Sequence, residues 1–132
     1  MYRLFTLAEA TDMIPTVDRL LGEMQDAARD IAILKERLGK LDPISVDARN
    51  CAQEIAFLIN GLHSVKAELD RMGVHIKDVE SGVVDFPSQL GAEVVCLSWE
   101  KGQDAITHYH RFGEDATKLL PHQANDNSSA SF

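Results

Sequence analysis

The sequence predicts an α+β protein in which a long antiparallel helical (coiled-coil) hairpin is followed by a small antiparallel β-meander. In the first half of the chain, two runs of apolar residues keep alternating steps of three and four, which is the period of packed helices. In the second half, apolar and polar residues alternate singly, as in half-buried strands. The chain has 132 residues, 45% hydrophobic and 26% charged, which is typical of one globular domain.

The same patterns divide the chain. We expect a single domain at residues 1–112, with the helical hairpin at 6–73 and the β-meander at 74–110. Residues 113–132 are predicted to be a mostly disordered tail, because Asn, Ser, Asp and Gln accumulate there.

The first helix is expected to begin at a capping box. Thr6 and Glu9 have the spacing at which a hydroxyl and a carboxylate each accept a hydrogen bond from an unpaired backbone amide. Pro15 lies inside this helix and predicts a kink or a restart between Asp12 and Pro15. Beyond it, the apolar positions form one unbroken heptad seam: Val17, Leu20, Met24, Ala27, Ile31, Leu34, Leu38 and Leu41.

The second helix is expected after a short turn at Asp42 and Pro43, because a proline disfavours the helical conformation of the residue before it. Ser45 or Asp47 can cap this helix, and Gly73 is a candidate for its left-handed C-cap. Its seam has the same spacing: Ala48, Cys51, Ile55, Leu58, Leu62, Val65, Leu69 and Met72. Two seams joined by a short turn predict an antiparallel hairpin.

Several apolar residues lie beside the seams and would be exposed on a hairpin alone. They are Leu21, Ala28, Ala32 and Ile33 in the first helix and Ala52, Ala56, Phe57 and Ile59 in the second. We expect them to be covered by the sheet of this chain, by a second copy of the chain, or by both, and therefore predict a homodimer. The alternative is that some of them are singly exposed residues of the kind that every surface carries.

Predicted strands occupy residues 74–79, 83–86, 93–99 and 105–110. Pro87 is expected to end the second strand, with a turn at 88–91 after it. In the third strand, Val95, Leu97 and Trp99 are expected to share one face. The segment 101–104 has the length of a hairpin turn.

Charge and composition exclude several functions. With 13 basic and 21 acidic residues, the net charge is −8, and no basic face is evident, so we expect no nucleic-acid binding. No run of about 18 apolar residues is present, so we expect no membrane span. The N-terminal residues lack the features of a signal peptide, and two cysteines cannot form a disulfide framework. We therefore expect a cytoplasmic protein.

Three segments resemble the small bacterial family catalogued as domain of unknown function 2203: residues 5–15, 73–87 and 93–99. The block from Lys77 to Pro87, with its run Gly-Val-Val-Asp-Phe-Pro, is the most specific part. The family pattern continues with a Trp-Arg-x-Gly-Glu turn and a Trp-His pair, where this chain has Gln103 in place of Glu and Tyr109 before His110. The resemblance implies no activity.

Four residues of the meander are candidate metal ligands. Asp78 and Asp85 flank the first turn, while His108 and His110 alternate along the last strand and so point to the same face. Two imidazoles with one or two carboxylates suit Zn, Fe or Mn better than Ca. Possible additions are His75 and Glu100. The alternatives are a purely structural role, in which Asp85 caps the turn, and acid/base catalysis without a metal.

Cys96 lies in the third predicted strand, near candidate histidines. We expect it to act as a small hydrophobic residue, and a Cys-His nucleophile pair is the alternative. For the whole protein, the sequence favours a non-enzymatic scaffold or protein-interaction module built on the hairpin. The alternative is a metal-binding protein or metalloenzyme with a His/Asp site on the meander. The patterns leave open whether the protein is an enzyme.

Overall fold

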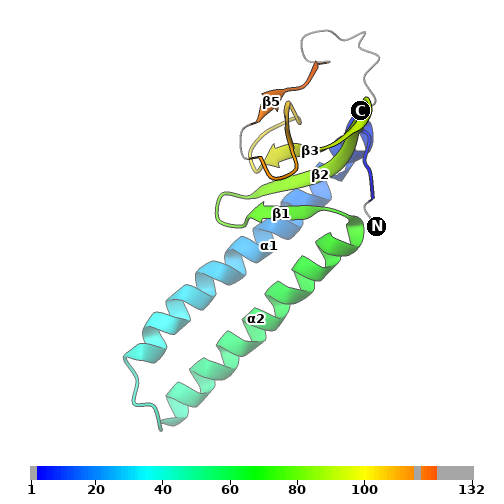
Figure 1. Cartoon of the computed structure of the whole chain (residues 1–132). Coiled ribbons are helices and arrows are strands. Elements are labelled where there is room, and N and C mark those ends of the chain that lie inside the picture. The colour runs from blue at the N-terminus through cyan, green and yellow to red at the C-terminus, as the bar shows by residue number, and fades with distance from the viewer. Residues whose placement is uncertain (1–2, 115–116, 122–132) are drawn as a thin grey trace.

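The computed structural model describes residues 3–114 and 117–121. Helices α1 (Leu7–Gly39) and α2 (Val46–Met72) pack together as a hairpin, and an antiparallel sheet lies against one end of it (Figure 1). The sheet has five strands in sequence order: β1 (His75–Asp78), β2 (Val83–Leu90), β3 (Glu93–Glu100), β4 (His108–Arg111) and β5 (Lys118–Leu119). The predicted α+β class is therefore confirmed. No helix in the described ranges is long and apolar enough to cross a membrane.

Helix α1 begins at the predicted capping box. Thr6 Oγ1 accepts a hydrogen bond from the Glu9 amide at 3.0 Å, and Glu9 Oε1 accepts one from the Thr6 amide at 2.9 Å. The restart predicted near Pro15 is wrong, because α1 is one continuous helix with Pro15 inside it. Proline removes one helical hydrogen bond. Ala10 and Val17, on either side of it, are buried in the same core, and this packing holds the helix together.

The capping box makes the stability of α1 sensitive to acid. The Thr6 backbone amide donates to the Glu9 carboxylate and holds the pKa of that carboxyl below its usual value. A carboxyl with a lowered pKa in the folded state stabilises the fold above its unfolded pKa, and this contribution is lost as the pH falls through the folded pKa. We therefore expect Glu9→Gln to melt below wild type at pH 7, and the difference in Tm to shrink below about pH 4.

The measurement is thermal unfolding by circular dichroism at a series of pH values. Glu68→Gln, at an exposed position of α2 outside any cap, is the control and should differ from wild type by a constant, small amount. A difference for Glu9→Gln that stays constant with pH would contradict the assigned role of the carboxylate.

Helix α2 also has the predicted ends. The Ser45 hydroxyl accepts from the Ala48 amide at 3.0 Å, and Gly73 ends the helix with a φ of 86°, in the left-handed region that glycine favours. The seams meet between the two helices as predicted. Their buried members are Val17, Leu20, Met24, Ile31, Leu34, Ala48, Cys51, Ile55 and Leu69.

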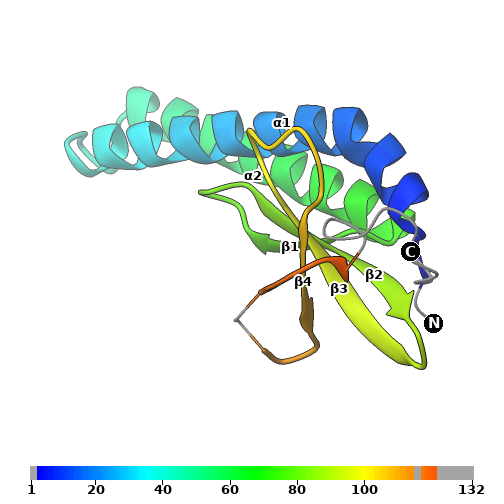
Figure 2. The same cartoon turned by 90° about the horizontal axis from the view of Figure 1, so that it is seen from above.

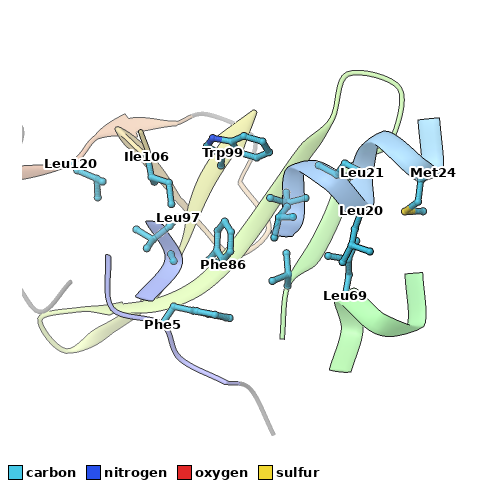
Figure 3. Packing of buried hydrophobic residues seen from close by; sticks show 14 residues of the cluster. Phe5, Leu20, Leu21, Met24, Leu69, Phe86, Leu97, Trp99, Ile106 and Leu120 are labelled. Atoms are coloured by element: carbon cyan, nitrogen blue, oxygen red, sulfur yellow. The ribbon is translucent and has the colours of Figure 1, made fainter. Parts of the chain in front are cut away.

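The larger hydrophobic core lies between the hairpin and one face of the sheet. Figure 3 shows Phe86, Leu97 and Trp99 of the sheet in the same cluster as Leu20 and Leu21 of α1. The sheet therefore covers Leu21, one of the apolar residues beside the seams. Others remain exposed: Ala28, Ala32, Ile33, Ala52, Ala56 and Phe57. The homodimer that they predict stays a prediction.

Strand β2 does not end at Pro87, as predicted, but continues to Leu90. The Pro87 carbonyl accepts a hydrogen bond from the Phe5 amide at 2.7 Å. The backbone nitrogen and carbonyl oxygen of this proline therefore face the N-terminal segment and not β3. The missing N–H therefore costs the β2–β3 ladder no hydrogen bond, and proline is tolerated there.

Two turns of the meander also differ from the prediction. The β2–β3 turn is Gly91 and Ala92 alone, with Gly91 at a φ of 61°, as a two-residue hairpin turn requires. Strand β4 begins at His108 and not at residue 105, because the preceding segment is held away from the ladder. The indole Nε1 of Trp99 donates to the Gln103 carbonyl at 3.0 Å, and Ile106 is buried in the larger core.

Strand β5 lies within the segment predicted as tail. Tyr109 of β4 pairs with Lys118, the Leu120 amide donates to the Thr107 carbonyl at 2.9 Å, and the Leu120 side chain is buried in the larger core. These apolar and backbone contacts account for order at residues 118–120. Residues 115–116 and 122–132 of the predicted tail lie outside the described residues.

Candidate metal centre

The sheet has two chemically different faces. Figure 2 shows both helices on one side of the sheet, and the residues that pack toward them, such as Phe86 and Leu97, are apolar. Their strand neighbours Asp85 and Cys96 point to the opposite face, because successive side chains of a strand alternate. Candidate functional groups therefore gather on the face turned away from the hairpin.

The strand register brings three of these side chains together. Cys96 of β3 lies directly opposite His110 of β4 and, on its other side, opposite Pro87 of β2. Asp85 precedes Pro87 by two residues, so it lies on the same face and diagonally next to Cys96. One ligand atom from each of Asp85, Cys96 and His110 lies within 4.8 Å of the other two.

Asp85 and His110 form a buried hydrogen-bonded pair. Their side chains are 13% and 6% exposed, and His110 Nε2 lies 2.9 Å from Asp85 Oδ1. The other ring nitrogen, Nδ1, lies 2.9 Å from the Arg111 carbonyl oxygen, which can only accept, so Nδ1 carries a hydrogen. A hydrogen bond between Nε2 and Oδ1 requires one proton, carried by the ring nitrogen or by the carboxyl group.

Cys96 is the third member of the cluster and is 3% exposed. Burial, and secondly the negative charge of Asp85, raise the pKa of its thiol to about 12. At neutral pH the metal-free thiol is therefore protonated, which disfavours the Cys-His nucleophile pair, since the thiolate is the nucleophile. Neither ring nitrogen of His110 is directed at the sulfur, because both are hydrogen-bonded elsewhere.

The spacing of the cluster fits a small divalent ion. Tetrahedral zinc has bonds of about 2.0–2.3 Å, which place neighbouring ligand atoms roughly 3.3–3.8 Å apart. The three ligand atoms, within 4.8 Å of one another, need only small side-chain movements to reach that spacing. An ion would take the place of the proton between Asp85 and His110. The bond from Nδ1 to the Arg111 carbonyl would leave Nε2 as the coordinating nitrogen, an arrangement that metal-binding histidines commonly have.

The structure does not bring the other predicted ligands into this cluster. The Asp78 carboxylate accepts hydrogen bonds from the hydroxyl and the backbone amide of Ser81, which lower the pKa of that carboxyl and close the turn before β2. His108 is on the same face as Asp85 and lies opposite Ser98, but its Nδ1 is 2.7 Å from Thr107 Oγ1. The possible additions, His75 and Glu100, are also outside the group.

Asp85 and His110 are among the predicted ligands, whereas Cys96 was predicted to act as a small hydrophobic residue. The one signal that could have placed Cys96 with them is the register of three strands, because only pairing with His110 and Pro87 puts its sulfur beside the Asp85–His110 pair. Strand alternation by itself showed only that Cys96 lies on the opposite face from Leu97.

A family model described as "Uncharacterized conserved protein (DUF2203)" matches residues 3–118, a span that includes all three members of the cluster. Comparison with curated proteins finds no match. Comparison with solved structures finds none either.

Proposed function

Because the chain belongs to this family of uncharacterised conserved proteins, whose description names no activity, we propose its function from the sheet itself: it binds a divalent transition-metal ion through Asp85, Cys96 and His110. The observation that carries the proposal is the convergence of three ligand types from three adjacent strands within 4.8 Å. A purely structural role would explain the hydrogen bond between Asp85 and His110, but such a role does not require a thiol beside this pair.

The ligand set favours zinc among the candidate ions. Zinc accepts thiolate, imidazole and carboxylate ligands, whereas manganese, magnesium and calcium prefer oxygen. Three protein ligands leave the fourth tetrahedral position for water or substrate, which is the arrangement of catalytic zinc sites and not of structural ones. This supports a metalloenzyme as the more specific form of the proposal.

The test is a calorimetric titration of tag-free, metal-stripped protein with Zn²⁺, Mn²⁺, Fe²⁺ and Mg²⁺. We expect one zinc per chain to bind with a micromolar or lower Kd, and Mg²⁺ not to compete. Cys96→Ser and His110→Gln should each weaken zinc binding by at least about 100-fold, because both remove a ligand. His108→Gln, on the same face but outside the cluster, is the matched control and should bind like wild type.

Cobalt gives an independent readout of the same site. Co²⁺ bound through a thiolate absorbs by charge transfer, so wild type should develop this band and Cys96→Ser should lack it. Equal and weak responses from wild type and all three variants would overturn the metal proposal.

A second candidate function, a non-enzymatic protein-interaction module, is supported by a different part of the molecule. The end of the hairpin distant from the sheet projects beyond it (Figure 1). On the helices of the hairpin, Ile33 is 59% and Phe57 75% exposed. Phe57 and Ile33 line two hollows that share Leu58, and apolar patches on a surface are typical of docking sites.

A further inference from the structure

The two helices enclose a shallow groove on the hairpin. Two adjoining hollows, of about 160 and 250 Å³, share Leu58. We define the hairpin groove by six of their lining residues: Ala27, Asp30, Leu34, Glu54, Phe57 and Leu58. Within the described ranges, all residues that line these hollows belong to α1 or α2, so the sheet leaves the groove uncovered.

The floor of the groove is apolar, and the side chain beside the floor is exposed to solvent. Leu34 is buried in the smaller hydrophobic cluster, and Leu58 packs against that cluster. Phe57 stands 75% exposed beside the floor. Gly61, one turn further along α2, lines the same hollow, and a Cβ atom there would meet nothing within 4 Å. A narrow apolar groove between helices is a recurrent docking site for an amphipathic helix.

Negative charge lines the same groove. Asp30 of α1 and Glu54 of α2 line one hollow, together with the apolar Leu34 and Leu58. Within the part of the chain that the structure describes, no Lys, Arg or His pairs with either carboxylate. By contrast, Glu23, which lines the other hollow, already pairs with Arg19 at 2.7 Å. Two carboxylates without an ion-pair partner among the described residues therefore border the apolar floor of the groove.

This charge distribution favours a cationic partner over a second copy of the chain. A second copy seated on the groove would bring the same two carboxylates with it, and the chain carries a net charge of −8. Like charges brought together at an interface are unfavourable, whereas complementary charges favour and orient binding. A partner with lysines or arginines beside an apolar stripe satisfies both features of the groove.

We propose that the hairpin groove docks a cationic amphipathic helix of another protein. The apolar face of that helix covers Phe57 and Leu58, and its lysines or arginines pair with Asp30 and Glu54. This inference rests on the second candidate function and names the chemistry of its partner. It is independent of the metal site, which lies on the sheet.

The probe is a synthetic amphipathic helix of Leu and Lys with a fluorescent label, and its counterpart with Glu in place of Lys. We expect the Lys peptide to bind, and Phe57→Ser to weaken it by about tenfold or more, as loss of an aromatic anchor does. Asp30→Asn/Glu54→Gln should weaken it similarly. The matched control is Asp12→Asn/Asp104→Asn, which changes the net charge equally at exposed positions outside the groove and should bind like wild type.

Three results would overturn the proposal. Equal weakening by the control pair would show charge attraction without a groove. Binding of the Glu peptide as tight as that of the Lys peptide would keep a docking groove but refute its charge preference. Light scattering that shows a dimer of the protein alone, split by Phe57→Ser, would assign the groove to a second copy.

Two further measurements separate these outcomes from other failures. The melting temperature of Phe57→Ser should equal that of wild type, since the side chain is mostly exposed, so lost binding cannot be ascribed to unfolding. Its zinc titration should also be unchanged. If the wild-type protein binds zinc but not the peptide, the docking proposal alone is refuted. If it binds the peptide but not zinc, the metal proposal alone is refuted.

Discussion

Replacing Phe86 with Ala is expected to lower the free energy of unfolding by about 3–5 kcal/mol. Phe86 is completely buried in the larger core. Its ring contacts that of Phe5 edge to face, with centroids 5.3 Å apart and planes at 80°. The substitution removes apolar burial, leaves a cavity and loses this aromatic pair. Because a small domain has a total stability of about 5–15 kcal/mol, the variant should approach the limit of folding.

The measurement is urea unfolding followed by circular dichroism, with Phe57→Ala as the matched control. The chemistry of the two substitutions is identical, but Phe57 is 75% exposed, so its loss should change the free energy of unfolding by no more than about 0.5 kcal/mol. Equal effects at the two positions would show that Phe57 is covered in solution or that the larger core is loosely packed.

The second large effect on the free energy of unfolding is expected at the hydrogen-bonded pair of Asp85 and His110. In metal-free protein, Asp85→Leu should cost about 3 kcal/mol, because His110, 6% exposed, would be left facing an apolar side chain through Nε2. Adding His110→Leu should recover part of this loss, since the double variant leaves no buried polar ring without a partner. The sheet face would then be held by apolar contacts alone.

A double-mutant cycle measured by urea unfolding in a metal chelator tests this expectation. The cost of the double variant should be smaller than the sum of the two single costs. Simple additivity would contradict a coupled pair and would indicate that water replaces the missing partner. The chelator keeps the result separate from the metal proposal, which concerns the same side chains with an ion bound.

The helical half of the fold follows from local signals in the sequence. The capping residues Thr6 and Ser45, the C-cap Gly73 and the heptad seams all act within a few residues, because helical hydrogen bonds join residues four apart. Local signals do not predict the continuity of α1 at Pro15, because that continuity depends on distant packing. The lost hydrogen bond favours a break, but burial of Ala10 and Val17 against the rest of the core outweighs it.

The sheet shows the limit of such signals. Alternation predicted β3 and its two faces, because it is a property of the strand itself. The continuation of β2 through Pro87 depends on the β2–β3 register, which turns the nitrogen of this proline away from β3 and its carbonyl toward the Phe5 amide. Likewise, β5 depends on the burial of Leu120 in the larger core.

Residue chemistry and the alternation along β4 were sufficient to predict Asp85 and His110 as site residues. Their meeting with Cys96 was decided by tertiary structure alone. The two-residue turn at Gly91 sets the β2–β3 register, and the start of β4 at His108 sets the next one. A slip of one residue in either pairing would turn a strand's side chains to the opposite face. Chain order supplies the side-chain types, whereas turn geometry and core packing, which act between distant residues, bring three of these side chains within 4.8 Å of one another.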